Sequence, residues 1–158
     1  MLLLLKNLLF TVLVPGTVAF FVPYRIVFRG TESVRLDAVR LALAAPLVVL
    51  GLGIYFWCLW DFAVRGRGTP APVDPPKHLV VRGLYARVRN PIYVGVLLVV
   101  TGWAVLFHSR AVLEYGIVLG LLFHLFVVLV EEPQLRRRFG ASYQSYCRAV
   151  PRWLPWVK

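Results

Sequence analysis

The sequence predicts an all-α membrane protein with about four transmembrane helices and a C-terminal amphipathic helix on the cytoplasmic side. Of the 158 residues, 59% are hydrophobic, and the mean hydropathy is +0.74, which is too apolar for a soluble domain of this length. The apolar residues form long blocks, and a helix of about 20 apolar residues crosses the hydrocarbon core of a bilayer. The length suits one domain, so we expect residues 1–158 to form a single membrane unit.

Polar residues, glycines and prolines bound the four expected spans, which cover residues 2–22, 39–60, 91–107 and 111–130. Pro15-Gly16 predicts a kink in the first span, and residues 23–38 are expected to form a polar loop. The aromatic run at residues 55–60 is typical of the headgroup level of a membrane. Because only residues 108–110 separate the last two spans, these spans should form an antiparallel hairpin.

The basic residues indicate both a partner and an orientation. The net charge is +11, and the positive residues cluster between apolar blocks, which favours anionic lipid headgroups over nucleic acid as a partner. Most of the 18 lysines and arginines lie near the termini or in the long loop at residues 61–90, so both termini and this loop are expected in the cytoplasm. The cysteines and histidines lack ligand-like spacing, so no metal is expected.

Residues 82–95, with the sequence RGLYARVRNPIYVG, join a basic loop to the third span. Asn90-Pro91 is typical of a helix start, with an amide at the N-cap and proline at the first helical position. Such an N-terminus presents unpaired N–H groups and the positive end of the helix dipole. Arg82, Arg87 and Arg89 lie close by in the sequence, so this turn is predicted to receive an anion.

Residues 131–155 form a second segment with polar character. Glu131 and Glu132 lie at the C-terminal end of the fourth span, where the helix dipole disfavours negative charge. Either neighbouring arginines (Arg87, Arg89 or the cluster at 136–138) or a cationic ligand must compensate them. Residues 134–148 have an amphipathic pattern, which predicts a helix lying on the membrane surface, with packing of its aromatic stripe in a protein core as the alternative. Residues 150–156 should be extended because each proline disfavours helix before it.

If both segments face the cytoplasm, they can enclose one pocket with cationic donors, anionic acceptors and flat rings. A zwitterionic molecule with an aromatic base would suit such a pocket. S-adenosylmethionine is one such molecule, and the chemistry of the residues is compatible with it without being unique to it.

Both segments resemble motifs of the isoprenylcysteine carboxyl methyltransferase and phospholipid methyltransferase superfamily. Residues 83–95 resemble its R-(H/N)-P-x-Y-x-G motif, and residues 131–152 resemble its block E-E-x-x-L-x-x-x-F-G-x-x-Y-x-x-Y followed by Val-Pro-Arg. Members that methylate prenylcysteine have histidine before the proline, where this chain has Asn90. Asparagine can cap a helix and donate a hydrogen bond, but it cannot shuttle a proton near neutral pH.

The resemblance implies transfer of a methyl group from S-adenosylmethionine to a hydrophobic or lipid-borne acceptor that enters from the bilayer. It implies a cofactor site formed by Tyr85, Arg89, Asn90, Pro91, Tyr93, Gly95, Glu131, Glu132, Tyr143 and Tyr146. Arg152 or Arg87 would orient a carboxylate acceptor, as in isoprenylcysteine carboxyl methylation, and Glu131 would assist an amine acceptor. A phosphatidylethanolamine amine and a small thiol are the alternative acceptors. A non-catalytic membrane scaffold that keeps the fold is the alternative of another class.

Overall fold

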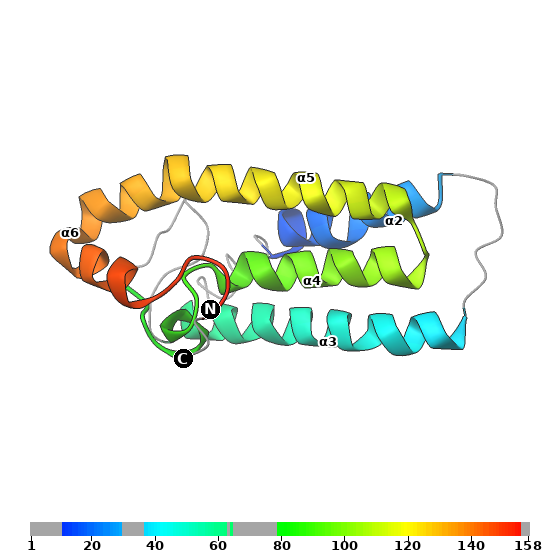
Figure 1. The fold of residues 1–158 in the computed structure, drawn as a ribbon, viewed down its shortest axis with the longest axis horizontal. Helices are drawn as coiled ribbons and strands as arrows, with labels where there is room; N and C mark the ends of the chain where they lie inside the picture. The colour runs from blue at the N-terminus through cyan, green and yellow to red at the C-terminus, as the bar shows by residue number, and fades with distance from the viewer. Residues whose placement is uncertain (1–10, 30–36, 63, 65–78, 156–158) are drawn as a thin grey trace.

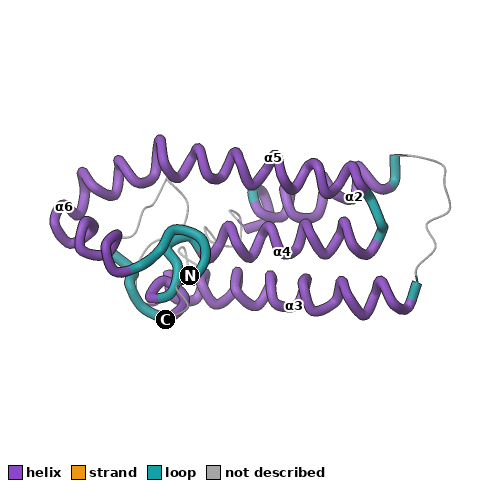
Figure 2. The backbone as a smooth tube through the Cα atoms, in the orientation of Figure 1, coloured by secondary structure: helices purple, strands orange, loops and turns teal. Residues whose placement is uncertain are grey.

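Helices that lie side by side form the body of the protein. The computed structural model describes residues 11–29, 37–62, 64 and 79–155. Every regular element in these ranges is helical, as Figure 2 shows. In chain order the elements are η1 (Thr17–Phe21), α2 (Val22–Val27), α3 (Ala38–Asp61), η3 (Gly83–Ala86), α4 (Pro91–Leu106), α5 (Arg110–Phe126), η4 (Val127–Glu131) and α6 (Glu132–Ala149). Helix α4 lies between α3 and α5 (Figure 1).

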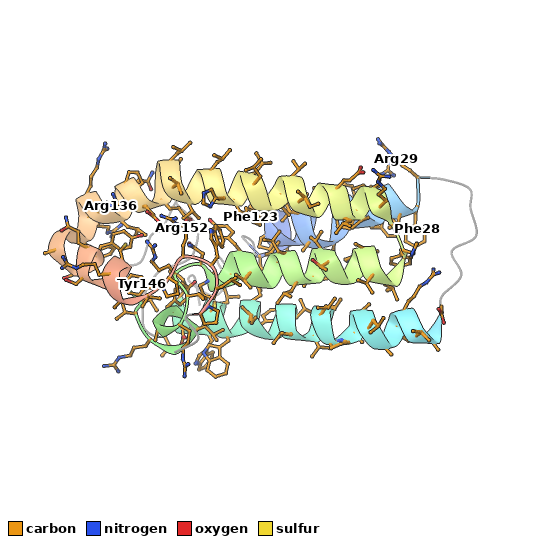
Figure 3. All side chains as sticks on the ribbon, viewed as in Figure 1. Phe28, Arg29, Phe123, Arg136, Tyr146 and Arg152 are labelled. Atoms are coloured by element: carbon orange, nitrogen blue, oxygen red, sulfur yellow. The ribbon has the colours of Figure 1, made fainter. Side chains whose placement is uncertain are left out.

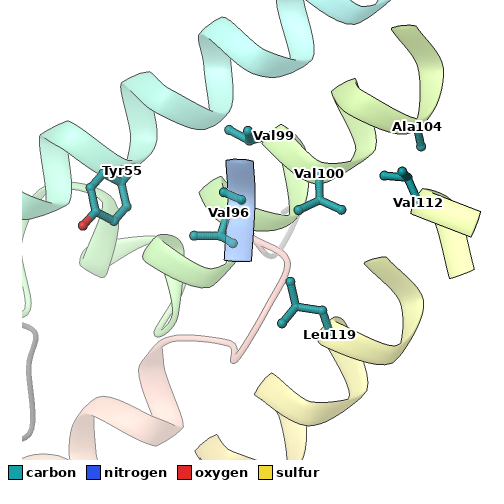
Figure 4. Packing of buried hydrophobic residues seen from close by; sticks show 8 residues of the cluster. Tyr55, Val96, Val99, Val100, Ala104, Val112 and Leu119 are labelled. Atoms are coloured by element: carbon teal, nitrogen blue, oxygen red, sulfur yellow. The ribbon is translucent and has the colours of Figure 1, made fainter. Parts of the chain in front are cut away.

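The centre of the protein is the surface of α4. Val96, Val99 and Val100 on α4 pack with Tyr55 of α3 and Leu119 of α5 in the largest buried cluster (Figure 4). Helices α3 and α4 approach closely because glycines face each other across them. A Cβ atom at Gly95 would lie 2.7 Å from the carbonyl oxygen of Gly51, so only glycine permits this separation of the two backbones.

The observed helices agree with the expected spans at α3, α4 and α5, but the first helix ends later than expected. Part of the 2–22 span lies outside the described residues. From Thr11 the helix continues to Val27, so the start of the 23–38 segment is helical rather than loop. Pro23, which lacks a backbone N–H, lies directly after the π-helical turn η1, where the helical hydrogen-bond pattern changes from π to α. The π-helical turn η1 follows Pro15-Gly16, where a kink was expected.

The long helices have the character of membrane spans. Helix α3 and the continuous helix Arg110–Ala149 are long and apolar enough to cross a bilayer, whereas Thr11–Val27 and α4 are apolar but shorter. Large apolar side chains such as Leu43 and Leu121 are more than half exposed on the outer surfaces of α3 and α5. Contiguous apolar surface of this kind suits a lipid environment.

Helix α5 continues through the π-helical turn η4 into α6, so that residues 110–149 form one helical path of 40 residues. At 1.5 Å per residue this path is about 60 Å long, twice the hydrocarbon thickness of about 30 Å, so α6 lies beyond the spanning part. Gly140 interrupts α6 with φ 52° and ψ −126°. This backbone conformation is accessible to glycine, and the second half of α6 turns back toward the other helices (Figure 1).

The apolar stripe of α6 is buried within the protein. This finding corrects the expectation that α6 lies on the membrane surface with its apolar side toward the bilayer. Tyr143 and Tyr146 are 2% and 9% exposed, and they form a buried cluster with Val150. Leu135 and Phe139 pack against the same cluster. The stripe therefore packs within the protein, which was the alternative interpretation of the same pattern.

Candidate functional site

The two motif segments meet at one end of the helices, as expected. Arg89, before α4, lies 3.0 Å from a carboxylate oxygen of Glu132 at the start of α6. Tyr146 donates a hydrogen bond of 2.7 Å to the carbonyl oxygen of Tyr85. The polar groups of residues 82–95 and 131–155 therefore form one site, beside the bend of α6 in Figure 1.

Glu132 is the centre of an ion-pair cluster, in agreement with the expectation that arginines compensate the glutamate pair. Besides Arg89, it accepts two hydrogen bonds from Arg152, at 2.7 and 3.2 Å, and one from Arg136 at 3.3 Å. Burial opposes its ionisation, but the hydrogen bond from Arg152 and the three positive charges outweigh burial and hold the pKa of Glu132 below its usual value. Glu132 thus joins residues that are 43 and 20 positions away in the sequence.

Glu131 has different surroundings. It accepts a hydrogen bond of 2.6 Å from the hydroxyl of Tyr93, and among the described residues no arginine pairs with it. Burial raises the pKa of Glu131, the hydrogen bond from Tyr93 opposes this rise, and the charge of Glu132 adds to it. Of the two adjacent carboxylates, Glu131 is therefore the one with capacity to bind a further cation or accept a proton.

The C-terminal strap, which we define as residues 150–155, passes over the start of α4. The backbone N–H of Arg89 donates to the carbonyl oxygen of Pro151 at 2.9 Å, and the side-chain amide of Asn90 donates to that of Arg152 at 3.1 Å. Asn90 occupies the N-cap position, but its side chain makes no capping hydrogen bond, which corrects the role given to it above. Asn90 instead fixes the strap, a task for which a hydrogen-bond donor suffices.

The strap is also attached to α5. Trp153 donates a hydrogen bond from Nε1 to Nδ1 of His124 at 3.1 Å, and its ring lies 6.4 Å from that of Tyr93. Figure 3 shows Arg152 and Tyr146 at this end of the molecule, with Phe28 and Arg29 at the opposite end.

A cavity of about 70 Å³ lies among these groups. Most of the predicted cofactor residues border it: Tyr85, Arg89, Asn90, Glu131, Glu132, Tyr143 and Tyr146. Nε of Arg89 is buried and has no hydrogen-bond acceptor among the described residues. The cavity is therefore bordered by a cationic side chain with one unpartnered donor, a carboxylate and several aromatic rings.

The remaining predicted residues lie elsewhere. Pro91 begins α4 and follows Asn90 of the cavity lining. Tyr93 does not border the cavity, but its hydroxyl bonds to Glu131, which does. Gly95 packs against α3 rather than the cavity, so its lack of a side chain serves helix packing. Arg87 is exposed, and Arg152 is committed to Glu132, which leaves neither in position to orient an acceptor in the way expected above.

Sequence reasoning missed part of the apolar lining and one buried acid. Phe62, Leu79, Val80 and Val127 also border the cavity, and the apolar pair at 79–80 within a basic loop was the signal for two of them. Asp61, taken as the first residue of the long loop, is the last residue of α3 and is 1% exposed.

These observations define a membrane-associated helical protein with a pocket at one end of its helices, where apolar and aromatic side chains surround a few charged groups. The profile of the phospholipid methyltransferase family matches residues 39–142, from α3 into α6. The chain belongs to this family.

The chain is also similar to Delta(14)-sterol reductase TM7SF2 of Mus musculus, with 32% identity over 103 residues. The match covers 61% of this chain and 23% of the reductase, so the chain spans less than a quarter of that relative's length. No solved structure matches the chain.

Proposed function

We propose that this protein is an integral membrane methyltransferase that uses S-adenosylmethionine to methylate a lipid-borne amine at the cavity beside Glu131. The observation that carries the proposal is the unequal use of the paired glutamates. Glu132 is held by three arginines, whereas Glu131 borders the cavity with Tyr93 as its hydrogen-bond partner.

The residues around the cavity fit the cosubstrate chemically. Arg89 borders the cavity, and its buried Nε, which has no partner, would donate to a carboxylate once the pocket widens. Glu131 offers an acceptor to an ammonium group. The rings of Tyr85, Tyr143 and Phe139 offer flat surfaces to an adenine. The volume of about 70 Å³ is well below the roughly 300 Å³ of the smallest usual ligand pockets. The pocket must therefore widen on binding, and the strap, which bonds Arg89 and Asn90 of the lining, is one segment whose contacts would change.

The arrangement favours an amine among the acceptors left open by the sequence. A carboxylate acceptor needs a free cation to orient it, but Arg152 is paired with Glu132 at 2.7 Å and Arg87 points to the exterior. An amine acceptor arrives as an ammonium and must lose a proton before it can react. Glu131 is suited to take this proton because its raised pKa brings it closer to neutral pH, where a general base works best.

S-adenosylmethionine, when bound, supplies a methyl carbon activated by an adjacent sulfonium. The amine nitrogen forms a bond to this carbon while the carbon–sulfur bond breaks and its electron pair stays on sulfur. The proton released by the ammonium goes to Glu131. The contribution of the protein is to position the two reactants and exclude water, which the strap and the aromatic lining support.

Binding of the cosubstrate is the first test. Calorimetry in lipid nanodiscs should detect S-adenosylmethionine binding, and Glu131→Gln should weaken it at least about tenfold because a charge-assisted hydrogen bond is lost. Glu114→Gln, the same change at the far end of α5, is the control and should bind as the wild type does. Equal affinity of wild type and Glu131→Gln would contradict the role of Glu131.

The acceptor is tested by incubating membranes with methyl-labelled S-adenosylmethionine. Base-stable label in the phospholipid fraction is expected for an amine acceptor, whereas base-labile label would indicate a carboxyl ester and overturn the choice of acceptor. Cosubstrate binding without any labelled product would favour a non-catalytic scaffold.

The similarity to a sterol reductase supports a second candidate function, reduction of a sterol. A reductase needs a hydride donor, so the same calorimetry with reduced nicotinamide dinucleotides separates the two functions. Binding of a nicotinamide in place of S-adenosylmethionine would favour the reductase.

We propose further that the pocket faces the cytoplasm, as the distribution of basic residues predicts. Ser145→Cys on α6 should then react with a membrane-impermeant thiol reagent only after cells are permeabilised. Ser109→Cys, in the turn between α4 and α5, should react in intact cells. The reverse pattern would invert the orientation.

A further inference from the structure

Arginines cover the exterior of the end of the molecule that holds the site. We define the arginine face as the exposed arginines at this end, which are Arg82, Arg87, Arg136, Arg137, Arg138 and Arg148. Figure 3 shows Arg136 projecting outward from the bend region. Among the described residues, only Arg136 of this set pairs with a carboxylate, that of Glu132.

The acidic residues described at this end neutralise the arginine face only at Arg136, which pairs with Glu132. Asp61 and Glu132 are 1% and 3% exposed, and Glu131 is half-buried with its carboxylate on Tyr93. The exterior of this end is therefore strongly positive over the described residues. A concentration of like charge has a cost in self-repulsion, which a bound anionic partner would remove.

Packing does not account for the arginines of α6. The opposite side of this helix carries the aromatic stripe, which is buried against the site. The arginines of α6 lie on the exposed side of the helix. Any polar residue at these positions would allow the helix to form, so the helix itself does not explain the positive charge. Their guanidinium groups are therefore accessible to a partner outside the chain.

The distance from the spanning helix indicates which partner is within reach. Arg136 to Arg138 follow Glu131 by five to seven residues, which is about 8 to 10 Å along a helix. The polar layer on each side of the hydrocarbon core is about 5 to 8 Å thick. With the hydrocarbon core ending near Glu131, these arginines would reach the outer edge of the polar layer, within side-chain reach of the lipid phosphates. Guanidinium groups bind phosphate oxygens in a bidentate manner.

We propose that the arginine face binds the headgroups of anionic phospholipids in the leaflet next to the site. The proposal does not depend on methyl transfer, because it concerns the exterior of the protein rather than the cavity. It predicts an annulus enriched in anionic lipid at this end and not at the other.

Native mass spectrometry of the full chain, from micelles containing equal amounts of phosphatidylglycerol and phosphatidylcholine, tests the proposal. The wild type should retain phosphatidylglycerol preferentially. The double variant Arg137→Gln/Arg148→Gln should lower the ratio of bound phosphatidylglycerol to phosphatidylcholine about fivefold or more, given the usual attraction of each arginine to an anionic surface. Both positions are exposed and lie outside the cavity lining, and elution volume and thermal midpoint establish that the variant is folded.

The matched control is Arg25→Gln/Arg29→Gln, which removes the same charge from exposed positions at the other end. This control should keep the lipid ratio within about twofold of the wild type, since its arginines are not part of the proposed surface. Absence of a preference in the wild type, or an equal loss in both double variants, would overturn the proposal. Loss of the preference on adding millimolar inorganic phosphate would also overturn it, because the surface would then be a general anion site.

Discussion

The two ends of the helices use charge in different ways. At the far end, Arg110 pairs with Glu114 at 2.8 Å and Arg40 with Asp37 at 3.8 Å, all within one helical turn and all exposed. At the site end, the side chain of Glu132 is 4% exposed and joins α6, the loop before α4 and the strap. The ion pairs at the far end join neighbouring residues of one helix, whereas the ion pairs at the site end connect segments that are distant in the sequence.

This difference has an energetic consequence. Exposed pairs between neighbours on a helix contribute little because water and salt screen them. Removing one partner from a buried cluster leaves the other charges without compensation in a poorly solvated place. Loss of an arginine–carboxylate pair is therefore expected to change the free energy of unfolding little at the far end of this protein and strongly at the site end.

The largest expected effect comes from Glu132→Ala. Arg89, with a side chain only 11% exposed, would lose its carboxylate partner, and the strap would lose its ion pair. We expect the free energy of unfolding to fall by about 3 kcal/mol, measured by denaturant titration in detergent. A loss as small as that of an exposed pair would remove the distinction between the two ends.

The pH dependence of stability should follow the same cluster. The lowered pKa of Glu132 means that its stabilisation is complete above the ordinary glutamate pKa of about 4.3 and is lost as the pH falls through the lowered value. Glu131 has a raised pKa and acts in the opposite sense, because its burial cost disappears on protonation.

We therefore expect the thermal midpoint of the wild type to fall as the pH drops below about 4.3, the ordinary glutamate pKa. Glu132→Gln should flatten this fall, and Glu131→Gln should steepen it. Identical pH profiles for both variants would contradict the division of roles between the two glutamates.

A smaller effect is expected at Asn90, which holds the strap through one hydrogen bond. Asn90→Ala should cost about 1 kcal/mol and raise the rate of amide hydrogen exchange in residues 150–155. Asn90→His can still donate a hydrogen bond and should protect the strap better than Asn90→Ala. If histidine and alanine gave equal exchange, donation by this side chain would not be what fixes the strap.

The smallest effect is expected at the far end. Glu114→Ala removes an ion pair whose side chains are 91% and 59% exposed, and it should change the free energy of unfolding by less than about 0.5 kcal/mol. A loss comparable to that of Glu132→Ala would show that the far end also depends on its charges.

The sequence predicted the helices and the meeting of the two motif segments because both follow from local patterns. Hydrophobic blocks mark the helices α3, α4 and α5, and the Asn90-Pro91 start and the Glu131-Glu132 pair mark the helix ends that meet. Helical geometry could also have predicted that Tyr93 and Gly95 do not belong to the same site. They are two residues apart and so about 200° apart around α4, and could not both face one cavity.

The partners of individual charged groups could not be predicted. Whether Arg152 is free for an acceptor or paired with Glu132 depends on the path of the strap, which has no periodic pattern. The same holds for Asn90, whose amide bonds the strap and not its own helix. The inward direction of the α6 stripe depends on Gly140, since a straight helix would have carried Tyr143 and Tyr146 away from the site.

The π-helical turn Val127–Glu131 determines where this helix can lose a residue. A π turn accommodates one residue more than an α-helical turn, so deleting a residue from Val127 to Val130 would allow the path to close as ordinary α-helix, and Glu132 would keep its orientation relative to α5. The same deletion within the α-helical part of α5 would rotate everything after it by about 100°. Glu132 would then swing away from Arg89, although every charged residue would still be present in the chain.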